Sequence, residues 1–167
     1  MSKYETVDYK VIEKEHDFEI RQYEAFNTVA VDEDRLDSSG FNQIFNYISG
    51  NNANHEKIPM TVPVINEMKD GEVSTEFVMP HKYSAETLPK PSNPDLEIRT
   101  IQGKLTASVT FSGTVTENKI KRYEKELSEW LTNKNIKSVG NFRLARYNSP
   151  FSLPALRRNE ILIDIKK

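Results

Sequence analysis

The tetrapeptide Phe18-Glu19-Ile20-Arg21 is repeated 78 residues later as Leu96-Glu97-Ile98-Arg99. A second similarity begins ten residues after the start of each copy, between Thr28-Val29-Ala30-Val31 and Thr106-Ala107-Ser108-Val109. The offset is constant and has no gap, and the same order of predicted elements follows each copy. Self-similarity at a fixed spacing is typical of an internal repeat. We therefore predict that the chain arose by duplication of one structural unit.

Hydrophobic patterns predict the same elements in both copies. After the first copy, apolar residues recur at i, i+3, i+4 and i+7, which is the spacing of a helix with one buried face. In the second copy, apolar residues and hydroxyl residues alternate over 105–111, which is typical of a strand. The predicted elements are strands at Val7–Ile12 and about 18–33, a helix at about 40–49, strands at about 58–66, 73–79 and 105–111, a helix at about 117–132, and strands at about 141–147 and 160–166.

These elements predict an α+β fold that is a single domain over residues 1–167, with internal repeats at about 18–80 and 96–166. One helix and a few strands give a thin core, so neither repeat is expected to fold alone. We expect the two β-α-β-β repeats to form one curved, barrel-like antiparallel sheet with both helices packed on it. The strands that contain Val29 and Ala107 should then be equivalent under a pseudo-twofold rotation.

Composition limits the class of protein. The chain has 167 residues, a net charge of −2 and no cysteine, which excludes disulfides, iron–sulfur clusters and thiolate-ligated haem. No apolar run approaches the roughly 18 residues of a spanning helix, and the first residues lack the apolar core of a signal peptide. We expect a cytoplasmic monomer that binds neither nucleic acid nor a membrane.

The sequence contains no catalytic signature. A nucleophile elbow, a zinc-protease helix motif and a glycine-rich phosphate loop are all missing from it. Six glycines in the whole chain also argue against a loop that cradles a nucleotide. We therefore predict that the protein is not an enzyme.

The chain has three histidines, which are candidate ligands for iron. His16, His55 and His81 each lie among polar residues, and the simplest interpretation is that all three are at the surface. A histidine can also be an axial ligand of haem iron. His55 is the candidate metal ligand because it lies between the predicted first helix and the next strand.

Two further segments are candidates for ligand contact. In Ile58–Val64 apolar residues alternate with two prolines, which predicts an edge or bulged strand. Met60 could form an adaptable wall of a groove there, although simple protection of the edge is an equal explanation. The long loop before the last strand contains Phe151 and leads to Arg157 and Arg158. These arginines could bind propionates or phosphates, or could pair with Glu160 and Asp164.

Several segments resemble the SOUL family of haem-binding proteins. They occur in order and span roughly residues 4–166. They are Phe18–Tyr23, Gly40-Phe41 with Tyr47–Asn52, Met60–Val64, Phe77–Pro80, and Tyr147–Pro150 with Arg157–Glu160.

The resemblance implies a fold of two β-α-β-β repeats and binding of haem or another tetrapyrrole, a small planar hydrophobic ligand that folding does not require. In the family, binding is largely apolar, in a shallow groove beside the first helix and with no agreed axial ligand. The groove positions here are Phe41 and Phe45. We expect at least one of these two rings to border the groove, while the alternative is that both are buried core residues.

The chain departs from the family pattern at the rim of this groove. Basic residues that meet the propionates in the family are replaced here by Ser38, Asn46 and Ser152. The duplicated fold also resembles effector-binding domains of the gyrase-inhibitor-like type. Two alternatives therefore stay open, namely a binding module for other amphipathic small molecules and a protein-interaction module without a small ligand.

Overall fold

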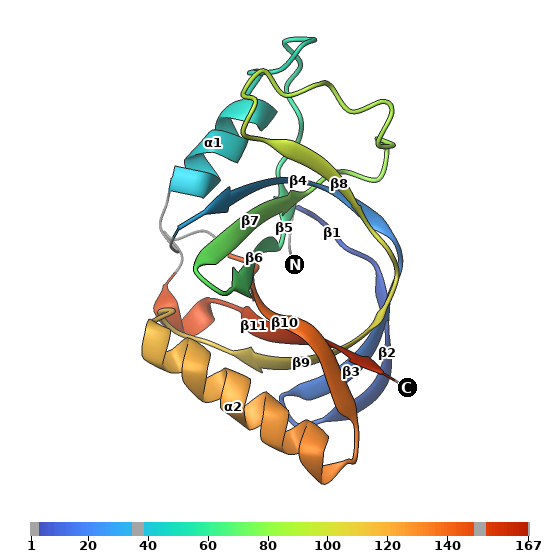
Figure 1. Ribbon diagram of the computed structural model, residues 1–167, viewed down its shortest axis with the longest axis vertical. Helices are drawn as coiled ribbons and strands as arrows, with labels where there is room; N and C mark the ends of the chain where they lie inside the picture. Colours follow the sequence, from blue (N-terminus) through green and yellow to red (C-terminus); the bar gives the residue numbers. More distant parts are fainter. Residues whose placement is uncertain (1–3, 35–38, 149–152, 167) are drawn as a thin grey trace. The chain divides into compact units, whose positions relative to one another are not determined.

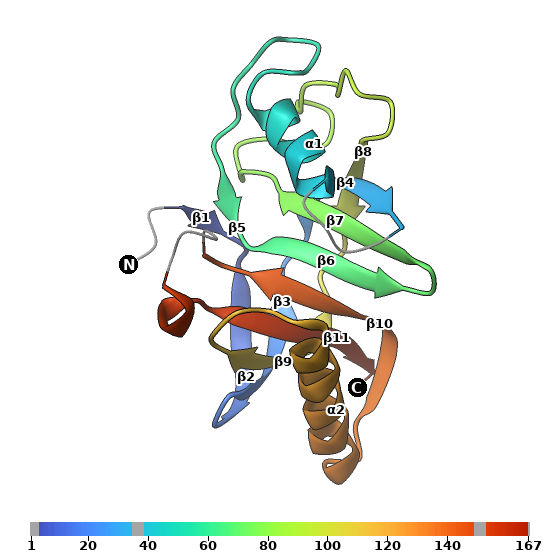
Figure 2. The same ribbon diagram turned by 90° about the vertical axis from the view of Figure 1, so that its left-hand side faces the viewer.

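The computed structural model describes residues 4–34, 39–148 and 153–166 (Figures 1 and 2). The chain divides into two compact units: unit 1 is Met1–Val7 with Ala25–Gln102, and unit 2 is Asp8–Glu24 with Gly103–Lys167. Each unit contains an antiparallel sheet and one α-helix, which confirms the predicted α+β class. Among the residues described, no helix has the length and apolar character needed to cross a membrane.

Unit 1 consists of strands and one helix in this order: β1 (Glu5–Thr6), β4 (Phe26–Glu33), α1 (Ser39–Ile48), β5 (Thr61–Val62), β6 (Val64–Lys69), β7 (Glu72–Val78) and β8 (Glu97–Ile101). The antiparallel sheet has the order β6-β7-β4-β8. The short strands β1 and β5 form a separate parallel pair. Helix α1 packs against β4 and β7 (Figure 1).

The core of unit 1 lies between α1 and its sheet. The helical period places Ile44, Tyr47 and Ile48 on one side of α1, where all three are buried. They share a single apolar cluster with Val29 of β4 and Phe77 of β7. The predicted packing of Ile44 and Ile48 on the sheet is therefore confirmed.

Unit 2 consists of the remaining elements in this order: β2 (Tyr9–Glu15), β3 (Phe18–Tyr23), β9 (Leu105–Phe111), α2 (Glu117–Asn133), β10 (Lys137–Arg146), the 3-10 turn η1 (Pro154–Leu156) and β11 (Asn159–Lys166). The antiparallel sheet has the order β2-β3-β9-β11-β10. Helix α2 packs against β9, β10 and β11 (Figure 2).

Helix α2 begins at a capped residue and buries one apolar stripe. The Thr116 hydroxyl accepts a hydrogen bond of 3.2 Å from the Lys119 backbone N–H, which satisfies one of the unpaired donors of the first turn. At the other end of the helix, the Trp130 ring stacks on Phe18 of β3 with 5.0 Å between ring centroids. The buried side of α2 comprises Ile120, Leu127, Trp130 and Leu131.

The two copies of the repeated tetrapeptide lie in different units and pair in the same register. In unit 2, β3 pairs with β9 and Arg21 is opposite Thr106. In unit 1, β8 pairs with β4 and Arg99 is opposite Thr28. The order β8-β4-β7-β6 of unit 1 then corresponds to β3-β9-β11-β10 of unit 2. Among the described elements, β2 of unit 2 has no counterpart in unit 1.

The unit boundaries differ from the predicted repeats of 18–80 and 96–166. Only two residues separate β3 from β4, a spacing at which neighbouring strands often form a hairpin. Instead, the Tyr23 backbone N–H donates to the carbonyl oxygen of Lys104 at 3.0 Å, and β3 pairs with β9. Duplication, a single domain and the pseudo-twofold equivalence of the Val29 and Ala107 strands stay predictions.

Two details of the predicted sheet are wrong. The expected barrel does not close in either unit, because among the described strands β6 does not pair with β8, and β2 does not pair with β10. The strand expected over 58–66 is broken at Pro63 into β5 and β6, because a proline has no N–H to donate. Thr61–Val64 is buried throughout, Pro63 included, whereas Pro59 is exposed.

Candidate functional site

Helix α1 in unit 1 presents an exposed aromatic side chain and has no charged residue of its own. Phe45 is 46% exposed, and its ring stacks on Phe41 with 5.9 Å between centroids and 11° between planes. Phe41 is half-buried and contacts the core ring of Phe77 at 5.0 Å. The alternative in which both helix aromatics are fully buried is therefore wrong. Phe45 is an exposed ring that is fixed through Phe41 to the core.

No residue of α1 carries a charge, since the helix reads Ser-Gly-Phe-Asn-Gln-Ile-Phe-Asn-Tyr-Ile. Its exposed polar side chains include Asn42 and Asn46. At the first turn, Gln43 donates a hydrogen bond of 2.7 Å to the carboxylate of Glu33, and Ser39 bonds to the same group. The exposed side of α1 therefore offers the Phe45 ring and amide side chains, and the Glu33 carboxylate at its start is already hydrogen-bonded.

Met60 belongs to the same part of unit 1 as the α1 aromatics. It is half-buried and packs, like Phe41, against the apolar cluster beneath α1. Two of the other predicted contact residues, Arg157 and Arg158, belong to unit 2. Phe151 lies outside the described residues, as do Ser38 and Ser152 of the predicted rim.

The loop after α1 is built around a buried amide that sequence reasoning did not single out. Asn52 is 1% exposed. Its Nδ2 donates to the carbonyl oxygens of Tyr47 and Glu56, at 3.0 and 2.8 Å, and its Oδ1 accepts from the backbone N–H groups of Asn54 and Glu56. One side chain therefore fixes residues 52–56 to the end of α1. The only sequence signal was its place in the segment Tyr47–Asn52 that resembles the family.

His55 lies within this fixed loop and is exposed. Its backbone φ is 51°, and its N–H donates to the carbonyl oxygen of Asn52 at 3.1 Å. Across residues 4–34, 39–148 and 153–166, no group of three potential metal ligands is present. Axial ligation by His55 stays a prediction.

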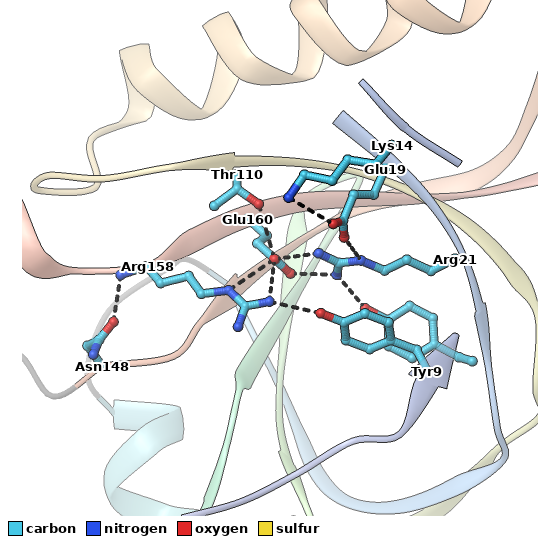
Figure 3. A network of polar contacts seen from close by, with 9 residues as sticks. Tyr9, Lys14, Glu19, Arg21, Thr110, Asn148, Arg158 and Glu160 are labelled. Carbon is cyan, nitrogen blue, oxygen red and sulfur yellow. Dashed lines mark hydrogen bonds and ion pairs between the residues drawn. The ribbon is translucent and has the colours of Figure 1, made fainter. Parts of the chain in front are cut away.

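Unit 2 contains a buried network of charged and phenolic side chains (Figure 3). Arg21 of β3 donates from Nη1 and Nη2 to the two carboxylate oxygens of Glu160 on β11, at 2.8 and 2.6 Å. Arg21 also donates to Glu19 at 2.7 Å and to the Tyr23 hydroxyl at 2.8 Å. Its guanidinium lies 4.3 Å from the Tyr9 ring centroid. In the sequence, Arg21 belongs to the repeat and to the segment Phe18–Tyr23 that resembles the family, and neither pattern predicted this network.

A second arginine approaches the same carboxylate from the surface. Arg158 donates from Nε and Nη2 to Oε2 of Glu160 at 3.2 and 2.9 Å, and from Nη2 to the Tyr9 hydroxyl at 3.1 Å (Figure 3). Its guanidinium lies 3.9 Å from the Tyr147 ring centroid. The pairing of Arg158 with Glu160, which was one predicted alternative, is therefore present. Arg157 is half-buried and ends the turn η1.

The electrostatics of this network favour fixed charges over proton transfer. Burial alone would raise the pKa of Glu160, but hydrogen bonds from Arg21 and the charges of Arg21 and Arg158 lower that pKa below its ordinary value. Burial is the main cause that raises the pKa of Tyr23 to about 12 and the pKa of Tyr147 well above its ordinary value. At neutral pH the carboxylate is therefore ionised and both phenols are neutral. Such groups position and bind, and are poorly suited to act as a general base near pH 7.

Unit 1 contains a related arrangement around the second arginine of the repeat. Arg99 donates to the Ser74 hydroxyl at 3.0 Å and to both carboxylate oxygens of Asp32 at 3.4 Å. Asp32 and Ser74 are opposite one another on β4 and β7, as Thr110 and Glu160 are on β9 and β11. Arg99 therefore bonds to both members of its cross-strand pair, whereas Arg21 bonds to the carboxylate of Glu160, which in turn accepts a hydrogen bond of 3.2 Å from the Thr110 hydroxyl.

Solved structures share the fold of this chain at low sequence identity. The C-terminal domain of EcmrR has a TM-score of 0.65 and 12% identity, with 95% of this chain and 98% of that domain covered. A hydrolase from Listeria innocua has a TM-score of 0.63 and 9% identity, with 93% and 94% covered. SAV2435 bound to tetraphenylphosphonium has a TM-score of 0.53 and 11% identity, with 95% and 94% covered. At these identities the likeness shows the fold alone.

Sequence comparison identifies the family. None of the curated proteins compared with the chain matches it. The family model described as "SOUL heme-binding protein" matches residues 4–164, which is nearly the whole chain and includes every segment that carried the resemblance. The chain therefore belongs to the SOUL haem-binding protein family.

Proposed function

We propose that this protein is a non-enzymatic binding protein for haem or another tetrapyrrole, whose ring lies against the exposed face of α1. The single observation that carries the proposal is the exposed Phe45 ring, stacked on Phe41 over a helix without charge. Family membership supports haem as the ligand class. Met60, which borders the same apolar cluster, supplies a further adaptable contact.

Apolar contact is sufficient to hold a porphyrin ring on this surface. Burial of apolar area contributes about 25 cal/mol per Å², and an aromatic pair adds about 0.5–1.5 kcal/mol beyond that area. Neither contribution requires an iron ligand. Since Phe45 is held by Phe41, its ring loses little conformational freedom when a ligand covers it. His55 is exposed on the adjoining loop and is not required in this arrangement.

The α1 surface fits the ring of a tetrapyrrole better than its carboxylates. Charge-assisted hydrogen bonds from basic residues are the strong way to bind a propionate, and α1 has no basic residue. Asn46 stands where the family places such a residue. We therefore expect haem to bind weakly, with its propionates in solvent or in contact with residues away from α1.

A second candidate is a binding module for amphipathic molecules other than tetrapyrroles. The observation that favours it is the same lack of charge on α1, which imposes no preference for an anion. The fold is shared with SAV2435, a protein whose structure holds tetraphenylphosphonium. Such a ligand has large aromatic faces and no carboxylate.

A titration with three ligands separates the two candidates. Purified protein is titrated with haemin, with protoporphyrin IX and with tetraphenylphosphonium, and binding is followed by absorbance or calorimetry. Saturable binding of both tetrapyrroles supports the proposal and indicates that iron is not needed. Saturable binding of tetraphenylphosphonium with none of either tetrapyrrole would replace the proposal with the second candidate.

A further inference from the structure

We propose that unit 2 has a separate binding site for the carboxylate of an amphipathic ligand, formed by Nη1 of Arg158 and the hydroxyl of Tyr9. This site goes beyond the α1 surface and does not depend on it. The apolar part of the ligand would lie along the turn η1, which immediately precedes Arg157 and Arg158 in the chain.

The donors of this site are held in place before any ligand arrives. Nε and Nη2 of Arg158 are occupied by Glu160 and Tyr9, and the guanidinium plane lies on the Tyr147 ring. Within the described part of the chain Nη1 has no hydrogen-bond partner, and no dashed line reaches it from the residues drawn in Figure 3. The guanidinium is therefore fixed while the two N–H groups of Nη1 are still available to donate.

The Tyr9 hydroxyl supplies a second donor beside Nη1. Its oxygen accepts from Nη2 of Arg158 at 3.1 Å, which leaves its own proton to donate. The ring is held against Tyr23, with 5.0 Å between centroids, and against the guanidinium of Arg21. One guanidinium N–H and one phenol O–H from neighbouring groups match the two oxygens of a carboxylate.

The charge of the network also favours an anion. Its members carry three positive side chains, Lys14, Arg21 and Arg158, and two carboxylates, Glu19 and Glu160. One positive charge is therefore not neutralised within the network. Arg21 is 1% exposed as a side chain, whereas Arg158 is 43% exposed and Lys14, which pairs with Glu19, is 66% exposed. A ligand from solvent therefore meets positive charge at Arg158 and at Lys14, and the open donors of Nη1 favour Arg158.

Exposed apolar side chains that shortly precede Arg158 in the chain indicate the rest of the ligand. Leu153 is 68% exposed and Leu156 is 71% exposed, the largest values among the large exposed apolar residues of the described chain. They flank and form η1, two to five residues before Arg158. A ligand with a carboxylate and an apolar body would cover both features, which a small inorganic anion would not.

The test uses dodecanoate as the probe, with dodecanol as the ligand that lacks the charge and acetate as the ligand that lacks the chain. Binding is measured by calorimetry and by chemical-shift changes in ¹H–¹⁵N spectra, including the Nε–H of Arg158. We expect saturable binding of dodecanoate and much weaker binding of dodecanol and acetate. Arg158→Gln should weaken dodecanoate binding about tenfold or more and Tyr9→Phe about fivefold, because each removes one hydrogen bond to a charged group.

Unit 2 provides matched controls on α2. Arg122 pairs with Glu126 at 2.9 Å and lies 5.0 Å from the Tyr123 ring centroid, so Arg122→Gln and Tyr123→Phe make the same chemical changes elsewhere. Both should leave dodecanoate binding unchanged. Leu156→Ser should weaken dodecanoate binding and leave acetate unaffected.

Thermal unfolding of each variant shows whether it is folded. Tyr9→Phe keeps the ring contacts with Tyr23 and Arg21, so it can still test the site if Arg158→Gln does not fold. The site is disproved if wild-type protein does not bind dodecanoate, if dodecanol binds equally well, or if folded Tyr9→Phe and Arg158→Gln bind like wild type. Loss of porphyrin binding in Phe45 variants would not change these results, so the two proposals fail separately.

Discussion

The guanidinium of Arg21 binds both carboxylate oxygens of Glu160, at 2.8 and 2.6 Å, with the two side chains 1% and 0% exposed. The remaining donors of Arg21 reach Glu19 and Tyr23, and Arg158 shares the same carboxylate. This satisfies the condition under which a buried ion pair is tolerated, namely that its hydrogen-bonding groups are paired. The pair joins β3 to β11, two strands that β9 separates in the sheet of unit 2.

Glu160→Gln should lower the free energy of unfolding by about 3 kcal/mol or more, because it leaves two guanidiniums without their shared counter-charge, one of them buried. Urea unfolding followed by circular dichroism measures the change. Glu126→Gln breaks an exposed pair on α2 with a similar distance and should leave the midpoint nearly unchanged. If the two variants unfold at the same urea concentration, the Arg21–Glu160 pair does not stabilise the fold.

Acid should destabilise the protein through the same carboxylate. Hydrogen bonds and charges from Arg21 and Arg158 hold the pKa of Glu160 in the folded state below its ordinary value of 4.5. Its contribution is therefore complete above the unfolded-state pKa and is lost as the pH falls through the folded-state pKa. Unfolding free energy measured from pH 7 down to pH 3 should fall, and the fall should be smaller in Glu160→Gln. Equal pH dependence in both proteins would contradict the assignment.

Gly40→Ala should destabilise unit 1 by about 1–3 kcal/mol because of overpacking. A Cβ at this position would lie 2.8 Å from Oγ1 and 3.1 Å from Cβ of Thr75, and 3.3 Å from Cγ1 of Val31. The glycine therefore sets how closely α1 approaches β4 and β7. Asn42→Ala on the exposed side of the same helix is the control and should be neutral or slightly stabilising. A neutral Gly40→Ala would show that α1 can shift outward at no cost.

Asn52→Ala should release the loop that carries His55. The change removes four hydrogen bonds at a residue that is 1% exposed, and groups left unpaired cost about 1–3 kcal/mol. Amide hydrogen exchange over residues 50–57 should become faster. Asn54→Ala removes an exposed amide side chain from the same loop and should leave exchange unchanged. Equal exchange in the two variants would mean that the buried amide does not fix the loop.

The helices were predictable from the sequence because their apolar stripes decide them. The stripe of Ile44 and Ile48 gave α1 to within a residue or two, although Phe45, which the pattern included in the same stripe, is 46% exposed. The buried network was not predictable, since Arg21 and Glu160 are 139 residues apart and are brought together only by the pairing of β3, β9 and β11. The break at Pro63 was missed because alternation alone does not reveal where a strand changes partner.

The most direct test of the central claim, that apolar contact with α1 holds the tetrapyrrole, is a haemin titration of three single variants followed at the Soret band. Phe45→Ala removes the 46% exposed ring, Val139→Ala removes a 40% exposed apolar side chain in unit 2, and His55→Ala removes the candidate iron ligand. We expect Phe45→Ala to weaken haemin binding about tenfold, while Val139→Ala and His55→Ala bind like wild type with an unshifted Soret band. Lost binding and a large Soret shift in His55→Ala, with Phe45→Ala unaffected, would show that axial ligation holds the haem and would contradict the proposed contact with α1.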